Sequence, residues 1–411
     1  MKNMITTTLL TAPRLFLLRP LATTTQALQF ASSRTETYKR NSNYCRRRHS
    51  HSDVVLHQSM SSSSSSSTTP GKDSQYIAVT EEDDNGTTLG GISLLEHVNI
   101  NVPDHSNLDF YTKILGMGLD PRRAANVAKG SGTIWANCGA SQFHLPYGET
   151  AQVIPGNIGL AYSSLQPLKD RITAATVSPG YDYEYEIRTD ERSGCEYVKL
   201  HDGYGNIMYA RERAVDLNTD VDTIKQPILS SQASSEAIKE FGEAIVTKYG
   251  RDNETECIGI DYVEFRCPRG TVSPISEFYE CALGAVVDVV QDGADDVAIV
   301  CCGKISASGR PTQCLIFRES DEPTPPYDGH HVALYVGDTR GDFEQVFKNC
   351  EKAGVVWANP RFSDKAHTLE GAKRYKQFRF KHILNLETGK TVFTLEHEMR
   401  SVEHSAWPGK R

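Results

Sequence analysis

The chain has 411 residues, of which 38% are hydrophobic and 23% are charged, so most of it should fold into two or three globular domains. Residues 1–70 contain nine Lys or Arg and two acids, a net charge of +7, which leaves −8 − 7 = −15 on the other 341 residues. Because residues 71–411 are this acidic, they should be repelled by nucleic acid and by anionic lipid, so neither is an expected partner. No apolar run reaches the roughly 18 residues of a membrane span.

The N-terminal region, residues 1–74, has the composition of a transit peptide followed by a disordered linker. It is rich in Ser and Thr, including the run from Ser61 to Ser67, and its first part could form an amphipathic helix with Arg14 and Arg19 on the polar side. These arginines interrupt the apolar stretch that a secretory signal would need. The sequence therefore predicts import into the mitochondrion, with the plastid or the cytosol as alternative locations.

The ten cysteines are scattered, with no Cys-x-x-Cys pair and no paired histidine spacing. Neither a structural zinc site nor a disulfide framework is indicated. We expect free, buried thiols in a reducing compartment.

The first half of the body contains two successive βαβββ units. Strand-like and helix-like segments follow in the order 94–102, 107–116, 119, 132–139 and 141–148, and then 157–165, 167–177, 181–189, 195–202 and 206–212. The strands show period-two alternation, and the first helix has Tyr111 and Ile114 on one apolar face. Gly116 stands where a left-handed helix cap is expected.

The second half repeats this order more loosely over residues 256–400, where Phe278, Tyr279 and Gly284 correspond to Phe110, Tyr111 and Gly116. Between the halves, residues 214–255 read as a linker with one helix, whose N-cap would be Ser235. The predicted fold class is α+β, with tandem βαβββ units, two in each of two domains at 92–213 and 256–400.

The segments LDFYTKILGMGL (108–119) and PGNIGLAY (155–162) carry a family resemblance. They resemble the vicinal oxygen chelate superfamily, which includes glyoxalase I, bleomycin-resistance proteins and extradiol dioxygenases. The resemblance implies that two units pair into an open cup. It also implies that the first and last strand of each unit supply ligands to a divalent ion.

Carried onto this sequence, the resemblance places metal ligands at His97 and His144 in the first unit. The second unit has Asn157 and Tyr209 at the equivalent positions, where the family usually has His and Glu. A cation without a carboxylate ligand binds weakly. Glu212 is nearby, but its strand parity requires a bulge before it can face inward.

The second half offers fewer ligands, because its four equivalent positions are Tyr262, Leu315, His331 and Phe393. We expect a metal (Fe, Zn, Mn or Ni) on His97 and His144, with Asn157 and Tyr209 lining the same first-half pocket. Tyr262 and His331 would line the separate cup of the second half, which the apolar Leu315 and Phe393 make a filled core or a hydrophobic ligand pocket without metal. The alternative for the first half is that His97 and His144 only line the cup.

Two C-terminal stretches have less specific interpretations. The basic segment Lys365–Lys381 reads first as an exposed loop and second as a clamp for an anionic ligand. Glu396, His397 and Glu398 read as a solvated strand edge.

Three functional hypotheses follow. The protein is a metal-assisted lyase, isomerase or dioxygenase acting on a small oxygenated molecule, a non-catalytic binding protein similar to bleomycin-resistance proteins, or a scaffold subunit. The sequence contains no glycine-rich phosphate loop, so no nucleotide cofactor is expected. Four units in one chain permit a monomer as well as a homodimer.

Overall fold

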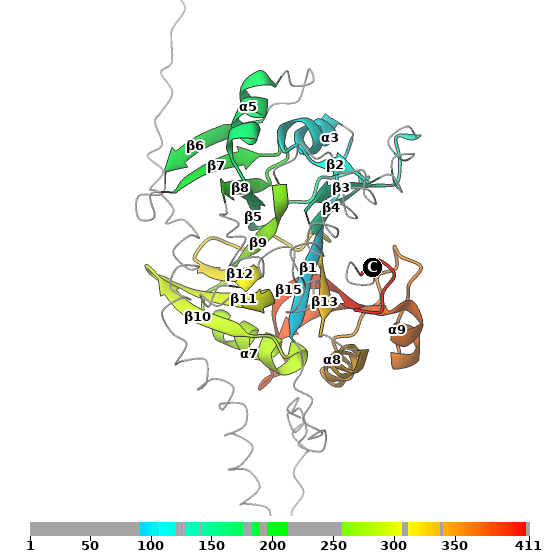
Figure 1. The fold of residues 1–411 in the computed structure, drawn as a ribbon. Helices are drawn as coiled ribbons and strands as arrows, with labels where there is room; N and C mark the ends of the chain where they lie inside the picture. Colours follow the sequence, from blue (N-terminus) through cyan, green and yellow to red (C-terminus); the bar gives the residue numbers. More distant parts are fainter. Residues whose placement is uncertain are drawn as a thin grey trace, which may run out of the picture.

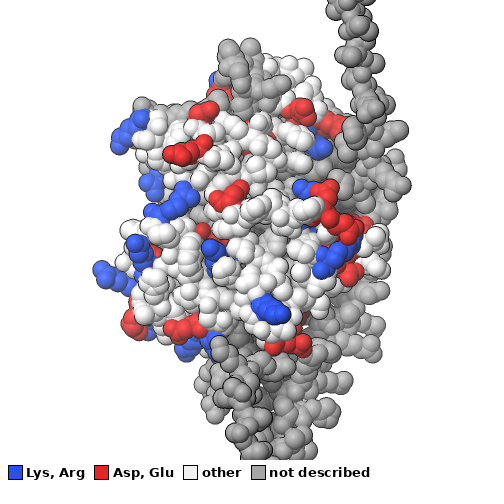
Figure 2. Space-filling model, turned by 180° about the vertical axis from the view of Figure 1, so that it is seen from behind, with Lys and Arg blue, Asp and Glu red and all other residues white. Residues whose placement is uncertain are grey.

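The computed structural model describes residues 91–407, with gaps at 105, 121–122, 124–125, 127–128, 140, 176–182, 190–194, 213–256, 306–310 and 338–339. The predicted transit peptide (1–74) and the linker helix (within 214–255) lie outside these residues. No helix in the described part is long and apolar enough to cross a bilayer. On the face in Figure 2, basic and acidic side chains are interspersed.

The described residues form four units that each begin with a strand and a helix, which confirms the α+β class with tandem βαβββ units (Figure 1). Unit 1 comprises β1 (Ile92–Asn99), α3 (Ser106–Asp109), the π-helical turn η3 (Phe110–Ile114), β2 (Gly118–Leu119), β3 (Thr133–Cys138) and β4 (Ser141–Pro146). Unit 2 comprises β5 (Gly156–Tyr162), α5 (Gln166–Ala174), β6 (Tyr185–Thr189), β7 (Glu196–His201) and β8 (Ile207–Glu212).

The two units of the second half have longer strands. Unit 3 comprises β9 (Cys257–Pro268), α7 (Val272–Leu283), β10 (Val287–Asp292), β11 (Asp295–Ile305) and β12 (Pro311–Ser320). Unit 4 comprises β13 (His331–Val336), α8 (Arg340–Lys352), α9 (Leu369–Tyr375), β14 (Gln377–Leu384) and β15 (Thr391–Ser401). In unit 4 an isolated bridge between Val356 and Phe380 stands where the other units have a second strand.

The units do not pair in the order in which they follow one another. The first strand of unit 1, β1, pairs antiparallel with the first strand of unit 4, β13, and β5 of unit 2 pairs antiparallel with β9 of unit 3. We call the arrangement of units 1 and 4 the outer cup and that of units 2 and 3 the inner cup. The expectation that each half of the chain closes its own cup is therefore wrong, because all four first strands present equivalent edges and the repeat pattern does not say which edges meet.

Glycines close two of the helices as expected. Gly116, with φ of 69°, follows the end of η3, and Gly284, with φ of 63°, caps α7 through its N–H. The helix predicted over 107–116 is divided, since α3 passes into the π-helical turn at Phe110. The apolar sides of these helices pack against the sheet, where Phe110, Tyr111 and Phe278 are fully buried.

A single buried amide joins the two cups. Gln313 on β12 has 1% of its surface exposed, and its Oε1 accepts a hydrogen bond from the Leu95 N–H on β1. Its Nε2 lies 3.0 Å from the Leu95 oxygen, 3.0 Å from Ser141 Oγ and 2.8 Å from the Ile260 oxygen. The side chain of Gln313 in unit 3 thus supplies hydrogen-bond partners to backbone groups of Leu95 in unit 1 and of Ile260 in unit 3.

Gln313→Leu is expected to lower the free energy of unfolding by about 2–4 kcal/mol, because it leaves several buried backbone groups without partners. Denaturant unfolding of the full chain measures this change. The exposed Gln166→Leu on α5 is the matched control and should change stability little. Equal stability of the two variants would contradict the role given to Gln313.

Candidate metal centre

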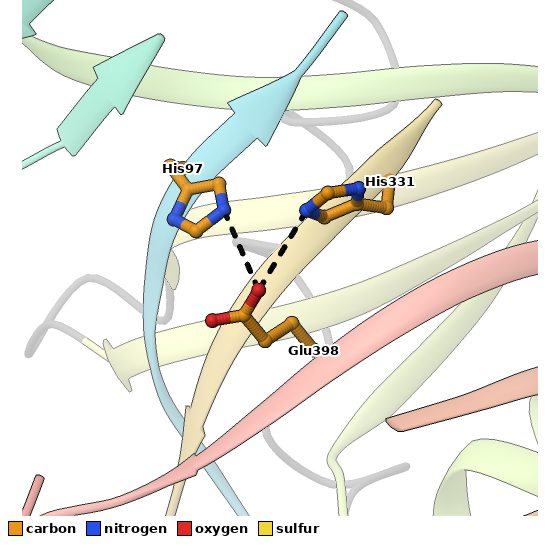
Figure 3. A group of neighbouring side chains, drawn as sticks. All are labelled: His97, His331 and Glu398. Carbon is orange, nitrogen blue, oxygen red and sulfur yellow. Dashed lines mark ion pairs between the residues drawn. The ribbon is translucent and has the colours of Figure 1, made fainter. Parts of the chain in front are cut away.

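Three buried side chains from units 1 and 4 converge in the outer cup (Figure 3). They are His97 on β1, His331 on β13 and Glu398 on β15, and their donor atoms all lie within 4.8 Å of one another. Glu398 Oε2 is 4.0 Å from His97 Nε2 and 3.7 Å from His331 Nε2. Two imidazoles and one carboxylate at this spacing form a candidate site for a divalent cation.

Strand register explains why these residues meet. His97 lies opposite Ala333 across the β1–β13 pair, and Glu398 lies opposite Ala333 across the β13–β15 pair. His331 is two residues from Ala333 and so projects from the same face of β13. The small side chain of Ala333 therefore stands between His97 and Glu398, on the same face as His331.

His97 is oriented by its neighbour in the chain. Its Nδ1 lies 2.5 Å from Glu96 Oε2, and because a carboxylate only accepts, Nδ1 carries the proton and donates it. Adjacent strand residues normally point to opposite faces, but β1 has a register shift between Leu95 and His97. This bulge gives Glu96 and His97 access to the same side, as bulges near functional sites commonly do.

The other ring nitrogen of His97 supports metal binding. Nε2 is buried and has no hydrogen-bond partner in the described structure, and it is aimed at Glu398. With the proton on Nδ1, this nitrogen presents a lone pair to the centre of the cup. A carboxylate that fixes the tautomer of a ligating histidine is the usual supporting arrangement at metal sites.

Two arginines hold the carboxylate of Glu398. Arg400 Nε lies 2.7 Å from Oε1, and Arg379 bonds Oε2. Arg400 also bonds Glu96 Oε2 at 2.7 Å, so it joins the ligand Glu398 to the residue that orients His97. The triad is thus embedded in one continuous network of buried charges.

The charges of this network do not cancel. Three buried carboxylates (Glu96, Glu396 and Glu398) face the two buried guanidinium groups of Arg379 and Arg400, a formal charge of 2 − 3 = −1, and burial raises the pKa of Glu396. Burying a net charge is costly unless a counter-ion is present. A cation held by Glu398 would offset this negative charge.

The pKa values follow from burial and from these pairs. Burial opposes ionisation of Glu398, but Arg379 and Arg400 hold the pKa of its carboxyl well below the usual range. Burial, and then the Arg379 guanidinium, lower the pKa of His331 well below its ordinary value, so this imidazole is neutral and able to ligate.

His144 approaches the site but does not join the triad. Its ring stacks on His97 with centroids 3.6 Å apart and on Trp135 at 4.6 Å. Its Nε2 lies 3.1 Å from Gln142 Oε1, which can only accept, so Nε2 is a donor here. His144 therefore packs against the candidate ligand His97 and is not one of the three converging side chains.

The segment that follows α8 packs beside the triad and contacts unit 1. The ring of Phe362 lies edge-on to His331 at 5.9 Å, and the Arg379 guanidinium lies 4.2 Å above the same ring. Arg361 reaches across to bond Asn101 Oδ1 of unit 1 at 3.1 Å.

The other predicted pocket residues lie in the inner cup. Asn157 Nδ2 donates to Glu264 Oε1 at 3.0 Å, and burial, followed by Tyr197 and Glu264, raises the pKa of Tyr209 to about 12. The ring of Tyr262 lies against Gly159, where an added Cβ would come within 2.1 Å of it. These residues are separate from the triad, because units 2 and 3 form their own cup.

Three further expectations differ from the structure. The last-strand residue of unit 4 beside His331 is Glu398 and not Phe393, which packs in the core against Phe265 and Phe317 as its apolar side chain predicted. The strand edge expected at 396–398 is buried, because β15 pairs with β13 on one side and β14 on the other. The expected loop 365–381 contains α9 and the start of β14, and Arg379 within it is buried.

Sequence reasoning missed Glu398 for an identifiable reason. The only available signal was the alternation of Glu396, Glu398 and Arg400 with buried His397 and Met399 on one strand. Charges at every second position of an internal strand mark a polar cup face. The sequence does not show that β15 is an internal strand, because its neighbours β13 and β14 are known only from the structure.

No family model matches this chain, and no curated protein matches its sequence. It is similar to the solved structure of glyoxalase I from Zea mays, with 14% identity, a TM-score of 0.45, and 75% of this chain and 92% of that chain covered. A candidate dioxygenase from Bacillus subtilis has 12% identity and a TM-score of 0.42, with 79% and 91% covered. The α+β fold class rests on the strand pairing described above.

Glu96 should make stability depend on pH. Burial opposes its ionisation, but Arg400 and His97 lower its pKa to about 2 from 4.5. The folded state therefore binds this proton less readily than the unfolded state, and the stabilisation, on the order of 3 kcal/mol, is present above pH 4.5 and is lost as the pH falls toward 2.

Unfolding of the metal-free protein between pH 2 and 6 tests this dependence. Glu96→Gln should be less stable at neutral pH and should lose less stability on acidification than the parent. Glu351→Gln, at an exposed position of α8, should follow the parent. Parallel curves for the parent and Glu96→Gln would show that Glu96 is not held ionised by Arg400 and His97.

Proposed function

We propose that the protein is a metal-dependent enzyme that binds a small oxygenated molecule in the outer cup. The observation that carries this proposal is the buried, partnerless Nε2 of His97, aimed at Glu398 beside His331. A buried nitrogen lone pair without a partner is destabilising unless something binds to it. The net negative charge of the surrounding buried network supports a cation as that ligand.

His97, His331 and Glu398 would hold the ion, with Glu96 fixing the tautomer of His97 and Arg400 linking both carboxylates. A bound divalent ion supplies Lewis-acid polarisation of substrate oxygens. Three protein ligands are fewer than the five or six that iron or manganese takes, so the remaining positions are open to water or to a chelating substrate.

The donor set favours one of the predicted reaction classes. Two histidines and one carboxylate with open positions are characteristic of non-haem Fe(II) oxygenases. We therefore place a dioxygenase with iron ahead of a lyase or isomerase with zinc, manganese or nickel. The neutral His144, whose ring contacts His97 at the edge of the cup, is placed to contact a substrate bound there.

A non-catalytic binding protein, or a scaffold subunit, is the second candidate. It is favoured by Arg379 and Arg400, which bond both oxygens of Glu398. In that case the buried charges would serve to fix the pairing of units 1 and 4. Metal content separates the two candidates.

We also propose that residues 1–74 direct the chain to the mitochondrion, with the plastid or the cytosol as alternatives. The basic, Ser-rich and acid-poor composition of this segment supports the proposal. A small molecule is the proposed partner, and the chain is proposed to act as a monomer or a homodimer.

Elemental analysis of the protein without affinity-tag histidines is expected to find about one equivalent of divalent metal. His97→Ala and His331→Ala should each lower the affinity by 100-fold or more, because two remaining ligands compete poorly with water. His144→Ala should keep the metal, and so should His201→Ala in unit 2, the matched control.

Ala333→Leu tests the geometry without removing a ligand. The larger side chain should fill the space between the three donors and lower metal occupancy while the fold is kept, as circular dichroism would verify. Metal loss in His144→Ala together with retention in His331→Ala would overturn this assignment of the ligands.

Nitric oxide added to the protein reconstituted with ferrous iron tests for open coordination positions. An iron–nitrosyl EPR signal that is lost in His331→Ala would support the enzyme. If iron binds but no such signal forms, protein ligands fill all of its coordination positions, which favours the non-catalytic candidate.

A further inference from the structure

Two buried cysteines from different cups lie against each other. Cys138 is the last residue of β3 in unit 1, and Cys257 is the first residue of β9 in unit 3. Their sulfur atoms are 2.8 Å apart, although the residues are 119 positions apart in the sequence. This separation is between that of a disulfide, about 2.05 Å, and that of two sulfurs in ordinary contact.

The backbone around the pair is equally close. Gly139 follows Cys138 with φ of 58°, and a Cβ added to it would lie 1.7 Å from the Ile258 oxygen and 2.7 Å from the Gly259 nitrogen. No residue with a side chain fits at this position. The chain at 138–139 is therefore pressed onto the chain at 257–259, and the approach of the two sulfurs follows from main-chain packing.

Burial shields this pair from solvent. Cys138 is 0% and Cys257 is 1% exposed. The hydroxyl of the neighbouring Tyr162 is buried too: it donates to the Leu115 oxygen, and burial and the two thiols raise its pKa. A crosslink formed here would be protected from reductants once the strands have closed over it. Oxidants must reach the thiols during folding or during local opening.

We propose that Cys138 and Cys257 form a disulfide that links the outer cup to the inner cup when the protein meets a hydroperoxide. One thiol attacks the peroxide, giving a sulfenic acid and water or an alcohol. The second thiol then attacks the sulfenic sulfur, the S–S bond forms, and a second water leaves. The two thiols lose two electrons in total and the peroxide gains them.

The crosslink would stabilise the fold through the unfolded state. It closes a loop of 119 residue positions, and a tie across so long a loop removes much of the freedom of the unfolded chain. The free thiols expected from the sequence are thus one of two states. Ser or Ala at either position keeps only the uncrosslinked state.

The test treats the full chain with hydrogen peroxide, once in the native state and once during refolding from denaturant. After digestion without reductant, mass spectrometry should find the peptides of Cys138 and Cys257 joined, with the loss of two hydrogen atoms. The oxidised protein should unfold about 5 °C or more above the reduced protein. Cys138→Ser and Cys257→Ser should abolish both the joined peptide and the shift.

Two controls keep the result specific. Cys350→Ser, a buried position on α8, should leave the crosslink and the thermal shift unchanged. Cys301 and Cys314 face each other across the β11–β12 pair and are the internal comparison. The proposal is overturned if both treatments leave Cys138 and Cys257 unjoined, or if peroxide joins them no more often than it joins Cys301 and Cys314.

Discussion

The antiparallel pairing of β1 with β13 is the contact on which the candidate site depends. It brings the first unit beside the fourth, although the two lie more than 200 residues apart in the sequence. Because β15 pairs with β13 in turn, the same contact sets the distance between His97 and Glu398 across the small Ala333. Without this pairing, His97 would face a cup with no carboxylate ligand.

The charged network is the second consequence of this pairing. A buried carboxylate is costly, and the outer cup buries three, Glu96, Glu396 and Glu398, each with an arginine partner. Arg400 of unit 4 pairs with Glu96 of unit 1, so the network also ties the two units together. Such a network is poor evidence for stability alone, but it fixes the tautomer of His97 and the position of Glu398, which is what a metal site requires.

The two cups have diverged in their chemistry. The inner cup contains Asn157, Tyr209 and Glu264 together with a neighbouring apolar cluster that includes Ile299 and Ile316. Its carboxylate Glu264 bonds Asn157 and pairs with Arg318. The histidines and the carboxylate that converge on a shared centre are in the outer cup, and this division explains why the candidate ligands come from the two ends of the chain.

Local features could be predicted from the sequence and long-range pairing could not. The repeat of four units, Gly116 and Gly284 as helix ends, and His97 and His331 as cup-facing residues depend on alternation within short segments. The partner of each first strand depends on edges that look alike in all four units. The bulge at Glu96 and the internal position of β15 are likewise invisible until the neighbouring strands are known.

Anomalous diffraction from crystals grown with manganese or iron tests the central claim most directly, because it locates the ion rather than counting it. The account predicts one strong peak in the outer cup, within bonding distance of His97 Nε2, His331 Nε2 and Glu398 Oε2. A peak at His144 without His331, a peak in the inner cup, or no peak in metal-saturated crystals would contradict it.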